Sequence, residues 1–181
     1  ISGIPVGSIK LMAAIETAMG VLNAREIAFA SKRLIGIAIG AEDFVTDMRT
    51  TRSHEGTELF AARSLILLAA RAAGIDALDT VFSDVNDEEG FENEVKLIKQ
   101  MGFDGKSVIN PKQIPVVHRI YTPSKKELEK AMRIIQVSEE AEKKGSGVVS
   151  LNGKMVDKPI IERAKRELTL ARAAGGEDFV Q

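Results

Sequence analysis

Two carboxylates offer the clearest chemistry in this sequence. Glu16 directly follows the apolar run Leu11–Ile15, and Asp43 follows the apolar run at 35–40. Their separation matches one strand-and-helix period, so both should lie at the carboxyl ends of neighbouring strands, which are ~4.8 Å apart. Two carboxylates at that spacing can bind one Mg²⁺, which keeps several waters and takes further oxygen ligands from its substrate. The spacing therefore predicts a magnesium site.

Other polar residues at predicted strand ends are further candidates, because function gathers at the carboxyl ends of strands in barrels and in open parallel sheets alike. Glu42 precedes Asp43, Asp84 follows the third apolar run, and Asn110 follows the fourth. Each acidic residue also has a structural alternative. Glu16 or Asp43 could begin a helix, and Asp84 could belong to a solvated acidic loop.

The composition excludes several kinds of chemistry. The 181 residues include no cysteine, which excludes disulfides, thiolate metal sites and a cysteine nucleophile. The 25 basic and 26 acidic residues leave a net charge of −1, so no basic field would gather nucleic acid or an anionic membrane. Of the two histidines, we expect His54 to be exposed in a polar loop and His118 to be structural.

Short apolar runs alternate with amphipathic segments along most of the chain. The pattern predicts strands at 11–15, 35–40, 77–83 and 107–109, with helices at 18–31, 58–73 and 91–101. Gly74 and Gly102 are placed to end the second and third helices. Consecutive strand-and-helix units predict an α/β protein with parallel strands.

The last third of the chain has a different pattern. Ser124 and Glu127 form a capping box that predicts a helix to about residue 144, which breaks at Gly145–Gly147. An extended piece at 148–151 and an Asn-Gly turn follow. Asp157 then precedes a helix that runs toward residue 174, where it could cap the helix, act in catalysis, or do both. We therefore expect a first domain at 1–122 and a helical segment at 123–181.

The number of strand-and-helix units poses a problem for a closed barrel. An eight-stranded barrel of this kind usually needs ~250 residues, and four units supply about half of one. We expect that half a barrel is missing from this chain, or that the chain completes itself by pairing with another copy.

Six ordered motifs together resemble the citrate lyase beta-like branch of the aldolase superfamily, and the likeness covers essentially the whole chain. They are Leu-Met-Ala-Ala-Ile-Glu-Thr-Ala-Met-Gly-Val-Leu-Asn-Ala (11–24), Gly-Ala-Glu-Asp-Phe (40–44), Glu-Gly-Thr-Glu-Leu-Phe-Ala-Ala-Arg (55–63), Ala-Ala-Arg-Ala-Ala-Gly-Ile (69–75), Gly-Phe-Asp-Gly-Lys-Ser-Val-Ile-Asn-Pro (102–111) and Gly-Val-Val-Ser-Leu-Asn-Gly-Lys-Met-Val-Asp-Lys-Pro (147–159).

The resemblance implies a Mg²⁺-dependent (β/α)8 TIM barrel, of which this chain supplies about the last four units, and a C-terminal helical lid. It implies that Glu16 and Asp43 hold the Mg²⁺. The stretch Gly40, Ala41 and Glu42 would lie beside the carboxylate of a keto acid. Asp84 is a weaker candidate for substrate binding, from its position after the third apolar run alone. A lid that reaches over a neighbouring subunit would offer Asp157 as the catalytic residue.

The implied reaction is cleavage of a citryl thioester to oxaloacetate and an acetyl thioester. The implied partners are the acyl carrier protein and acyl-transferase subunits of the lyase, a carrier or CoA thioester substrate, and further copies of the chain in a homo-oligomer. Alternatives are a malyl-CoA lyase, a malate synthase-like enzyme, or a non-catalytic assembly fragment. No apolar stretch reaches the ~20 residues of a membrane span, so we expect a cytoplasmic protein.

Overall fold

The computed structural model describes residues 3, 5–143, 149–151 and 154–174. The chain divides into two compact units, residues 1–117 and residues 118–181. Each unit has its own packed interior, so each is described by itself.

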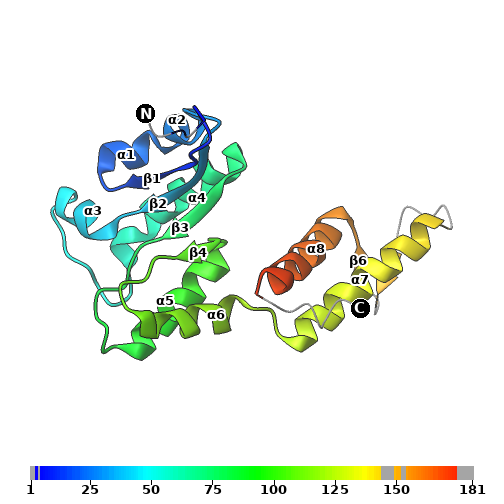
Figure 1. Cartoon of the computed structure of the whole chain (residues 1–181). Helices are drawn as coiled ribbons and strands as arrows, with labels where there is room; N and C mark the ends of the chain where they lie inside the picture. Colours follow the sequence, from blue (N-terminus) through cyan, green and yellow to red (C-terminus); the bar gives the residue numbers. More distant parts are fainter. Residues whose placement is uncertain (1–2, 4, 144–148, 152–153, 175–181) are drawn as a thin grey trace. The chain divides into compact units, whose positions relative to one another are not determined.

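The first unit is built on a four-stranded parallel sheet, with the strands in the order of the chain (Figure 1). The strands are β1 (Leu11–Ile15), β2 (Leu34–Ile39), β3 (Asp76–Asp79) and β4 (Gly105–Lys106). The α/β prediction with parallel strands is therefore confirmed. Because the strands run parallel, their carboxyl ends share one edge of the sheet.

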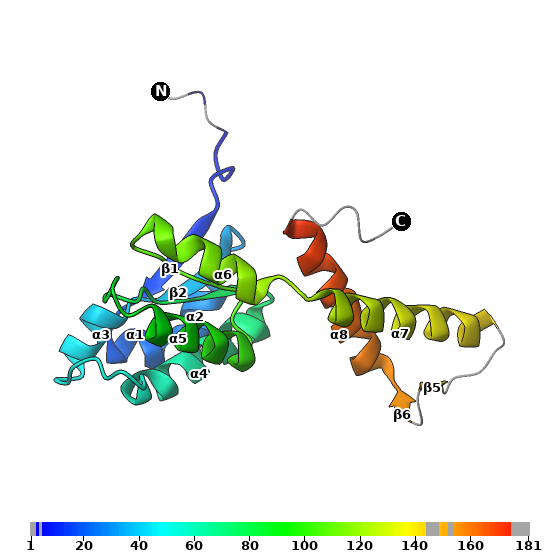
Figure 2. The ribbon, with the colours of Figure 1, turned by 90° about the horizontal axis from the view of Figure 1, so that it is seen from below.

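Helices connect these strands and cover the sheet. They are α1 (Ala18–Leu22), α2 (Ala24–Phe29), α3 (Ala41–Asp47), η1 (Thr57–Leu59), α4 (Phe60–Ala73), α5 (Glu88–Met101), η2 (Pro111–Gln113) and α6 (Ile114–Tyr121). Helices α2 and α4 pack against each other and against the sheet (Figure 2). The centre of the core holds Ile37 of β2, Ile66 of α4 and Val95 of α5, all with no exposed surface.

The first strand is left open at the edge of this sheet. Among the described strands, β1 pairs with β2 alone. Leu11 and Met12 of β1 and Ile35 of β2 are exposed although they lie on strands. An edge strand with exposed apolar residues is a surface on which further strands can pair.

Two sequence-based boundaries of the sheet were wrong. The fourth strand is Gly105–Lys106 rather than 107–109, and the third ends at Asp79 rather than at residue 83. The fourth strand was missed because its two residues are a glycine and a lysine. The lysine is buried here because it faces buried acidic partners, so it does not mark a solvated loop.

The first predicted helix is divided in two at Asn23. The side chain of Asn23 donates to the carbonyl of Met19, 2.9 Å away, and ends α1. Asparagine competes in this way with the helical hydrogen bonds of the backbone. The other predicted ends are confirmed, since Gly74 and Gly102 follow α4 and α5 with φ of 70° and 110°.

The second unit contains α7 (Lys125–Lys143), β5 (Val149–Leu151), β6 (Lys154–Val156) and α8 (Lys158–Ala173). Helices α7 and α8 pack together, and the antiparallel pair of β5 and β6 adds Val156 to their core. The capping box is confirmed, because Ser124 and Glu127 bond reciprocally. The predicted break at 145–147 and the Asn-Gly turn lie outside the described residues.

Over the described ranges, no helix has the length and apolar character needed to span a membrane.

Candidate functional site

Glu16 lies directly against the end of the neighbouring strand. Ile15 of β1 is in register with Ile39 of β2, and the amide of Gly40 donates to the Ile15 carbonyl at 2.9 Å. A Cβ atom added to Gly40 would lie only 2.6 Å from Oε1 of Glu16. Glycine is therefore required at residue 40 for the glutamate to rest in this position.

Asp43 lies in the first turn of α3, which begins immediately after Gly40. Glu16 and Asp43 thus belong to the same edge of the sheet, as the sequence predicted. Both are exposed. Within the described residues, neither carboxylate takes part in a hydrogen bond or an ion pair with the protein. The pair therefore keeps its oxygen atoms available to a ligand.

The donor set at this edge suits a hard cation that keeps some of its waters. Among the described residues, no group of three or more histidine, cysteine, aspartate or glutamate side chains could hold a metal ion. A cation bound by Glu16 and Asp43 would consequently depend on water or substrate oxygens for its remaining ligands. Mg²⁺ is commonly bound in that way.

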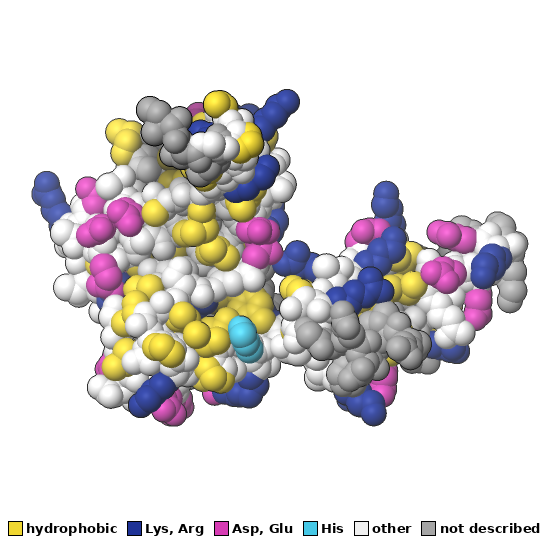
Figure 3. Space-filling model, in the orientation of Figure 1, with side chains coloured by type: hydrophobic (Ala, Val, Ile, Leu, Met, Phe, Trp, Pro, Cys, Tyr) yellow, Lys and Arg dark blue, Asp and Glu magenta, His cyan; other side chains and the backbone are white. Residues whose placement is uncertain are grey.

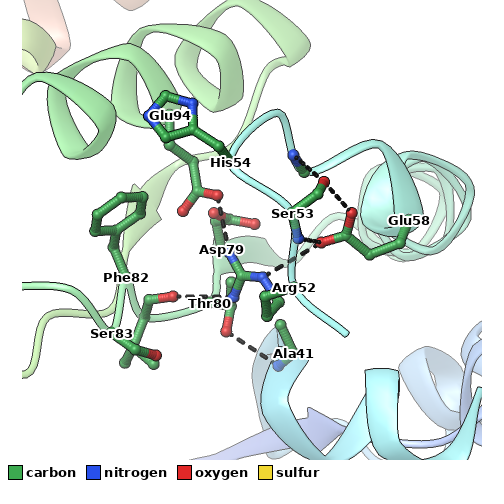
Figure 4. A network of polar contacts seen from close by, with 12 residues as sticks. Ala41, Arg52, Ser53, His54, Glu58, Asp79, Thr80, Phe82, Ser83 and Glu94 are labelled. Carbon is green, nitrogen blue, oxygen red and sulfur yellow. Dashed lines mark hydrogen bonds and ion pairs between the residues drawn. The ribbon is translucent and has the colours of Figure 1, made fainter. Parts of the chain in front are cut away.

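The residues between these carboxylates are held by the loop that follows β3. The amide of Ala41 donates to Oγ1 of Thr80 at 3.0 Å in a buried position. Glu42 accepts through Oε1 from the hydroxyl of Ser83 at 2.8 Å and from Nη1 of Arg52 at 3.4 Å. Ala41 and Glu42 are therefore both bonded to the loop that follows β3, and Figure 4 shows the contact between Ala41 and Thr80.

Asp84 and Asp157 each make local hydrogen bonds. The exposed Asp84 accepts from the amide of Asn86 at 2.9 Å, which is the bond of an Asx turn. Asp157 belongs to the second unit and caps α8 by accepting from the amide of Ile160 at 3.1 Å. The capping role of Asp157 is thus confirmed. Catalysis by Asp157 and substrate binding by Asp84 stay predictions.

A group of four buried charged side chains was not predicted from the sequence. Asp79 accepts two hydrogen bonds from Arg63, at 2.8 and 2.9 Å, and one from Nζ of Lys106 at 2.9 Å. Glu94 pairs with the same two cations, at 3.0 Å from Arg63 and in close contact with Lys106. We call Arg63, Asp79, Glu94 and Lys106 the buried charge cluster. Its two positive and two negative charges balance.

The charges of this cluster stabilise one another against the cost of burial. Burial by itself would raise the pKa of Asp79, but Lys106 and Arg63 outweigh it and hold that pKa below its ordinary value. Burial would likewise lower the pKa of Arg63, and the carboxylates of Asp79 and Glu94 raise it instead. Asp79 and Arg63 are therefore both ionised at neutral pH.

Arg52 joins the buried charge cluster to the candidate site. It donates through Nη1 to Glu42. Its Nη2 also donates to Glu94 at 3.0 Å, and its Nε lies 3.5 Å from Oε1 of Glu58 (Figure 4). Burial would raise the pKa of Glu58, but hydrogen bonds from Ser53 lower it overall. Arg52 thus contacts three carboxylates, and the sequence analysis assigned it no role.

A signal for the cluster was present in the sequence. Arg63 interrupts the apolar face of α4, and Glu94 occupies a core-facing position of α5 one turn before Ile98. Charged residues at positions where the helical period demands apolar ones indicate buried ion pairs.

Comparison with known proteins places the chain in a family. The family model for the HpcH/HpaI aldolase/citrate lyase family matches residues 2–111. The chain belongs to that family. It is 60% identical over 174 residues to citrate lyase subunit beta of Haemophilus influenzae, covering 96% of the chain and 59% of the relative. It is 39% identical over 168 residues to (3S)-malyl-CoA thioesterase of Cereibacter sphaeroides, covering 93% of the chain and 59% of that relative.

Two similar structures come from Mycobacterium tuberculosis. The protein CitE, in complex with magnesium, acetoacetate and coenzyme A, matches with a TM-score of 0.77 and 36% identity over 90% of the chain and 61% of that protein. The citrate lyase beta subunit complexed with oxaloacetate and magnesium matches with a TM-score of 0.59 and 39% identity, over 63% of the chain and 53% of that protein. The chain thus spans about three fifths of the length of these relatives.

Replacing the central aspartate tests the buried charge cluster. Asp79→Asn leaves Arg63 and Lys106 short of one buried negative charge, so the free energy of unfolding should fall by about 3–5 kcal/mol, measured by urea denaturation. Glu26→Gln in the same unit is the matched control, because its exposed carboxylate pairs at the surface with Arg25, a pair worth about 1 kcal/mol or less. Equal losses in the two variants would contradict the assigned role.

The same variant tests the pH dependence of stability. The pKa of Asp79 is lower in the folded chain than in the unfolded one, where it is about 3.9. The contribution of Asp79 to the free energy of unfolding is therefore complete above about pH 4. It is lost as the pH falls through the pKa that Asp79 has in the folded chain. Acidification from pH 5 to pH 3 should destabilise the original chain more than Asp79→Asn, and parallel curves would oppose this explanation.

Proposed function

We propose that this chain is the metal-binding part of a Mg²⁺-dependent carbon–carbon lyase that cleaves a citryl thioester to oxaloacetate and an acetyl thioester. The observation that carries the proposal is the pair Glu16 and Asp43 at the ends of adjacent strands, two carboxylates that make no hydrogen bond or ion pair within the part of the chain that the structure describes. The 60% identity to citrate lyase subunit beta supports the choice of substrate.

Glu16 and Asp43 would hold the cation. The close packing of Glu16 against Gly40 supports this assignment, because it brings the Glu16 carboxylate to the start of the helical turn that carries Asp43. When bound, Mg²⁺ would supply positive charge beside the substrate hydroxyl and stabilise the oxygen that becomes the oxaloacetate carbonyl. The turn formed by Gly40, Ala41 and Glu42 would lie beside the substrate carboxylate, with Asp84 at the same edge.

Cleavage of the carbon–carbon bond requires two proton movements. The tertiary hydroxyl of the citryl group loses a proton, and the electron pair of the broken bond passes to the carbon next to the thioester, which then takes up a proton. We assign Asp157 as the group that donates the proton to that carbon. A general acid must lie within hydrogen-bond reach of the atom that it protonates. Its bond to the Ile160 amide would hold the side chain in a defined orientation.

We further propose that residues 1–122 form the last four strand-and-helix units of a (β/α)8 barrel and that residues 123–181 form a lid. The open edge of β1 and the exposed apolar residues on β1 and β2 support this, since further strands would pair and pack there. Figure 3 shows apolar side chains on the surface of the first unit. The same surface would favour a homo-oligomer.

The partners follow from the proposed reaction. A citryl group carried on an acyl carrier protein subunit, loaded by an acyl-transferase subunit, would be the substrate, with a CoA thioester as its smaller equivalent. Malyl thioesters are the second candidate substrate class, because the (3S)-malyl-CoA thioesterase relative matches over a similar span at 39% identity. Offering both thioesters to one preparation distinguishes the two classes by which keto acid is released.

The metal pair is tested by neutralising each carboxylate. Glu16→Gln and Asp43→Asn should each weaken Mg²⁺ binding about tenfold or more in titration calorimetry, because each removes one of two anionic ligands. Glu26→Gln on α2 is the control, since it removes an exposed carboxylate that lies outside this edge. Unchanged binding in the first two variants would refute the ligand assignment.

The assignment of Asp157 is tested by Asp157→Asn. The turnover number should fall about 10²–10⁴-fold, as is usual when a general acid or base is removed, while Mg²⁺ affinity stays the same. The assay measures oxaloacetate released from citryl-CoA by the chain mixed with the part of the Haemophilus influenzae relative that it does not cover. Glu162→Gln, an exposed carboxylate of α8, is the control. Full turnover in Asp157→Asn would remove this residue from the mechanism.

A further inference from the structure

Three carboxylates lie at the ends of β1 and β2, and the protein treats them differently. Glu16 and Asp43 have no hydrogen bond or ion pair within the described residues. Glu42, the residue next to Asp43, is bound from two sides. Oε1 of Glu42 accepts from the Ser83 hydroxyl at 2.8 Å and lies 3.4 Å from Nη1 of Arg52. One of three neighbouring acidic groups is thus restrained and two are left available.

The guanidinium of Arg52 is itself held rigidly. Its side chain is 17% exposed, and it donates to Oε2 of Glu94 at 3.0 Å and to the carbonyl of Val81 at 3.5 Å. Glu94 is bound in turn to Arg63 and Lys106 in the buried charge cluster. Arg52 therefore cannot follow Glu42 toward the edge of the sheet without leaving a buried glutamate short of a partner.

The restraint on Glu42 would matter for a lyase that binds Mg²⁺. Mg²⁺ accepts about six ligands, and a lyase needs several of them for substrate oxygens. A third carboxylate would occupy one of these positions. It would also add negative charge beside a substrate that is itself an anion. Glu42 is the acidic side chain closest in sequence to Asp43 that could intrude in this way.

We propose that Arg52 and Ser83 are positioning residues that hold the Glu42 carboxylate away from the cation and leave Glu16 and Asp43 as its protein ligands. This inference rests on the proposed function, because it requires that Glu16 and Asp43 bind the ion. It goes beyond that function by assigning a role to Arg52 and Ser83. It also states that the Glu42 carboxylate does not bind the metal.

The experiment measures Mn²⁺ binding to the 181-residue chain by electron paramagnetic resonance, which detects the free ion and needs no catalysis. Arg52→Gln frees Glu42, so Mn²⁺ should bind about threefold more tightly or better, as expected when one negative charge about 6 Å away in water is no longer offset by the arginine. The double variant Arg52→Gln with Glu42→Gln carries the net charge of the original chain, and its affinity should return to the original value.

Two further variants separate release of Glu42 from simple loss of charge. Ser83→Ala alters no charge but removes one of the two restraints, so it should strengthen Mn²⁺ binding in the same direction by a smaller factor. Arg71→Gln removes a positive charge that pairs with Asp104 away from this cluster, and it should leave the affinity unchanged. Ser83→Ala also keeps the test decisive if Arg52→Gln fails to fold.

Glu16→Gln separates failure of this inference from failure of the proposed function. If Glu16→Gln weakens binding while Arg52→Gln and Ser83→Ala leave it unchanged or weaker, the restraint of Glu42 has no role in metal binding and the inference is overturned. If Glu16→Gln has no effect, the metal pair itself is wrong. A gain in Arg52→Gln that persists after Glu42→Gln is added would also overturn the inference.

Discussion

The arrangement of the first unit depends on the mutual neutralisation of four charges in its interior. Arg63 of α4, Asp79 of β3, Glu94 of α5 and Lys106 of β4 are each less than a tenth exposed. Each would be costly to bury alone, and together they form hydrogen-bonded pairs with no excess charge. Because the four residues come from four different elements, the pairing fixes those elements relative to one another.

This cluster reaches the candidate site by two routes. Lys106 donates to the carbonyl of Thr80 at 2.8 Å, and the Thr80 hydroxyl accepts from the amide of Ala41. Glu94 binds Arg52, which binds Glu42. Both routes end at the first turn of α3, where Asp43 also lies. A short helix at the edge of a sheet is thereby connected to the least exposed part of the unit, which favours a preorganised site.

Much of the first unit could be predicted from local patterns. Apolar runs located β1 without error and β2 to within one residue, and positive-φ glycines ended α4 and α5 as expected. The edge of the sheet that carries Glu16 and Gly40 was also predicted, because parallel strands align their carboxyl ends. These features depend on residues that are close in sequence.

The features that were missed depend on residues that are far apart in sequence. Lys106 looks like a loop residue until Asp79 and Glu94 are placed beside it, so β4 was assigned too late in the chain. Arg52 sits in an irregular segment, and only the fold brings it to Glu42 and Glu94. Pairings of that kind carry no local period and follow from the packing of α4 and α5 against the sheet.

The most direct measurement is an anomalous difference map from crystals of the 181-residue chain soaked in Mn²⁺. The account predicts one strong peak between the carboxylates of Glu16 and Asp43. Glu42 should remain bound to Arg52 and Ser83 in the same crystals. A peak coordinated elsewhere, or the absence of any peak between Glu16 and Asp43 at saturating Mn²⁺, would contradict it.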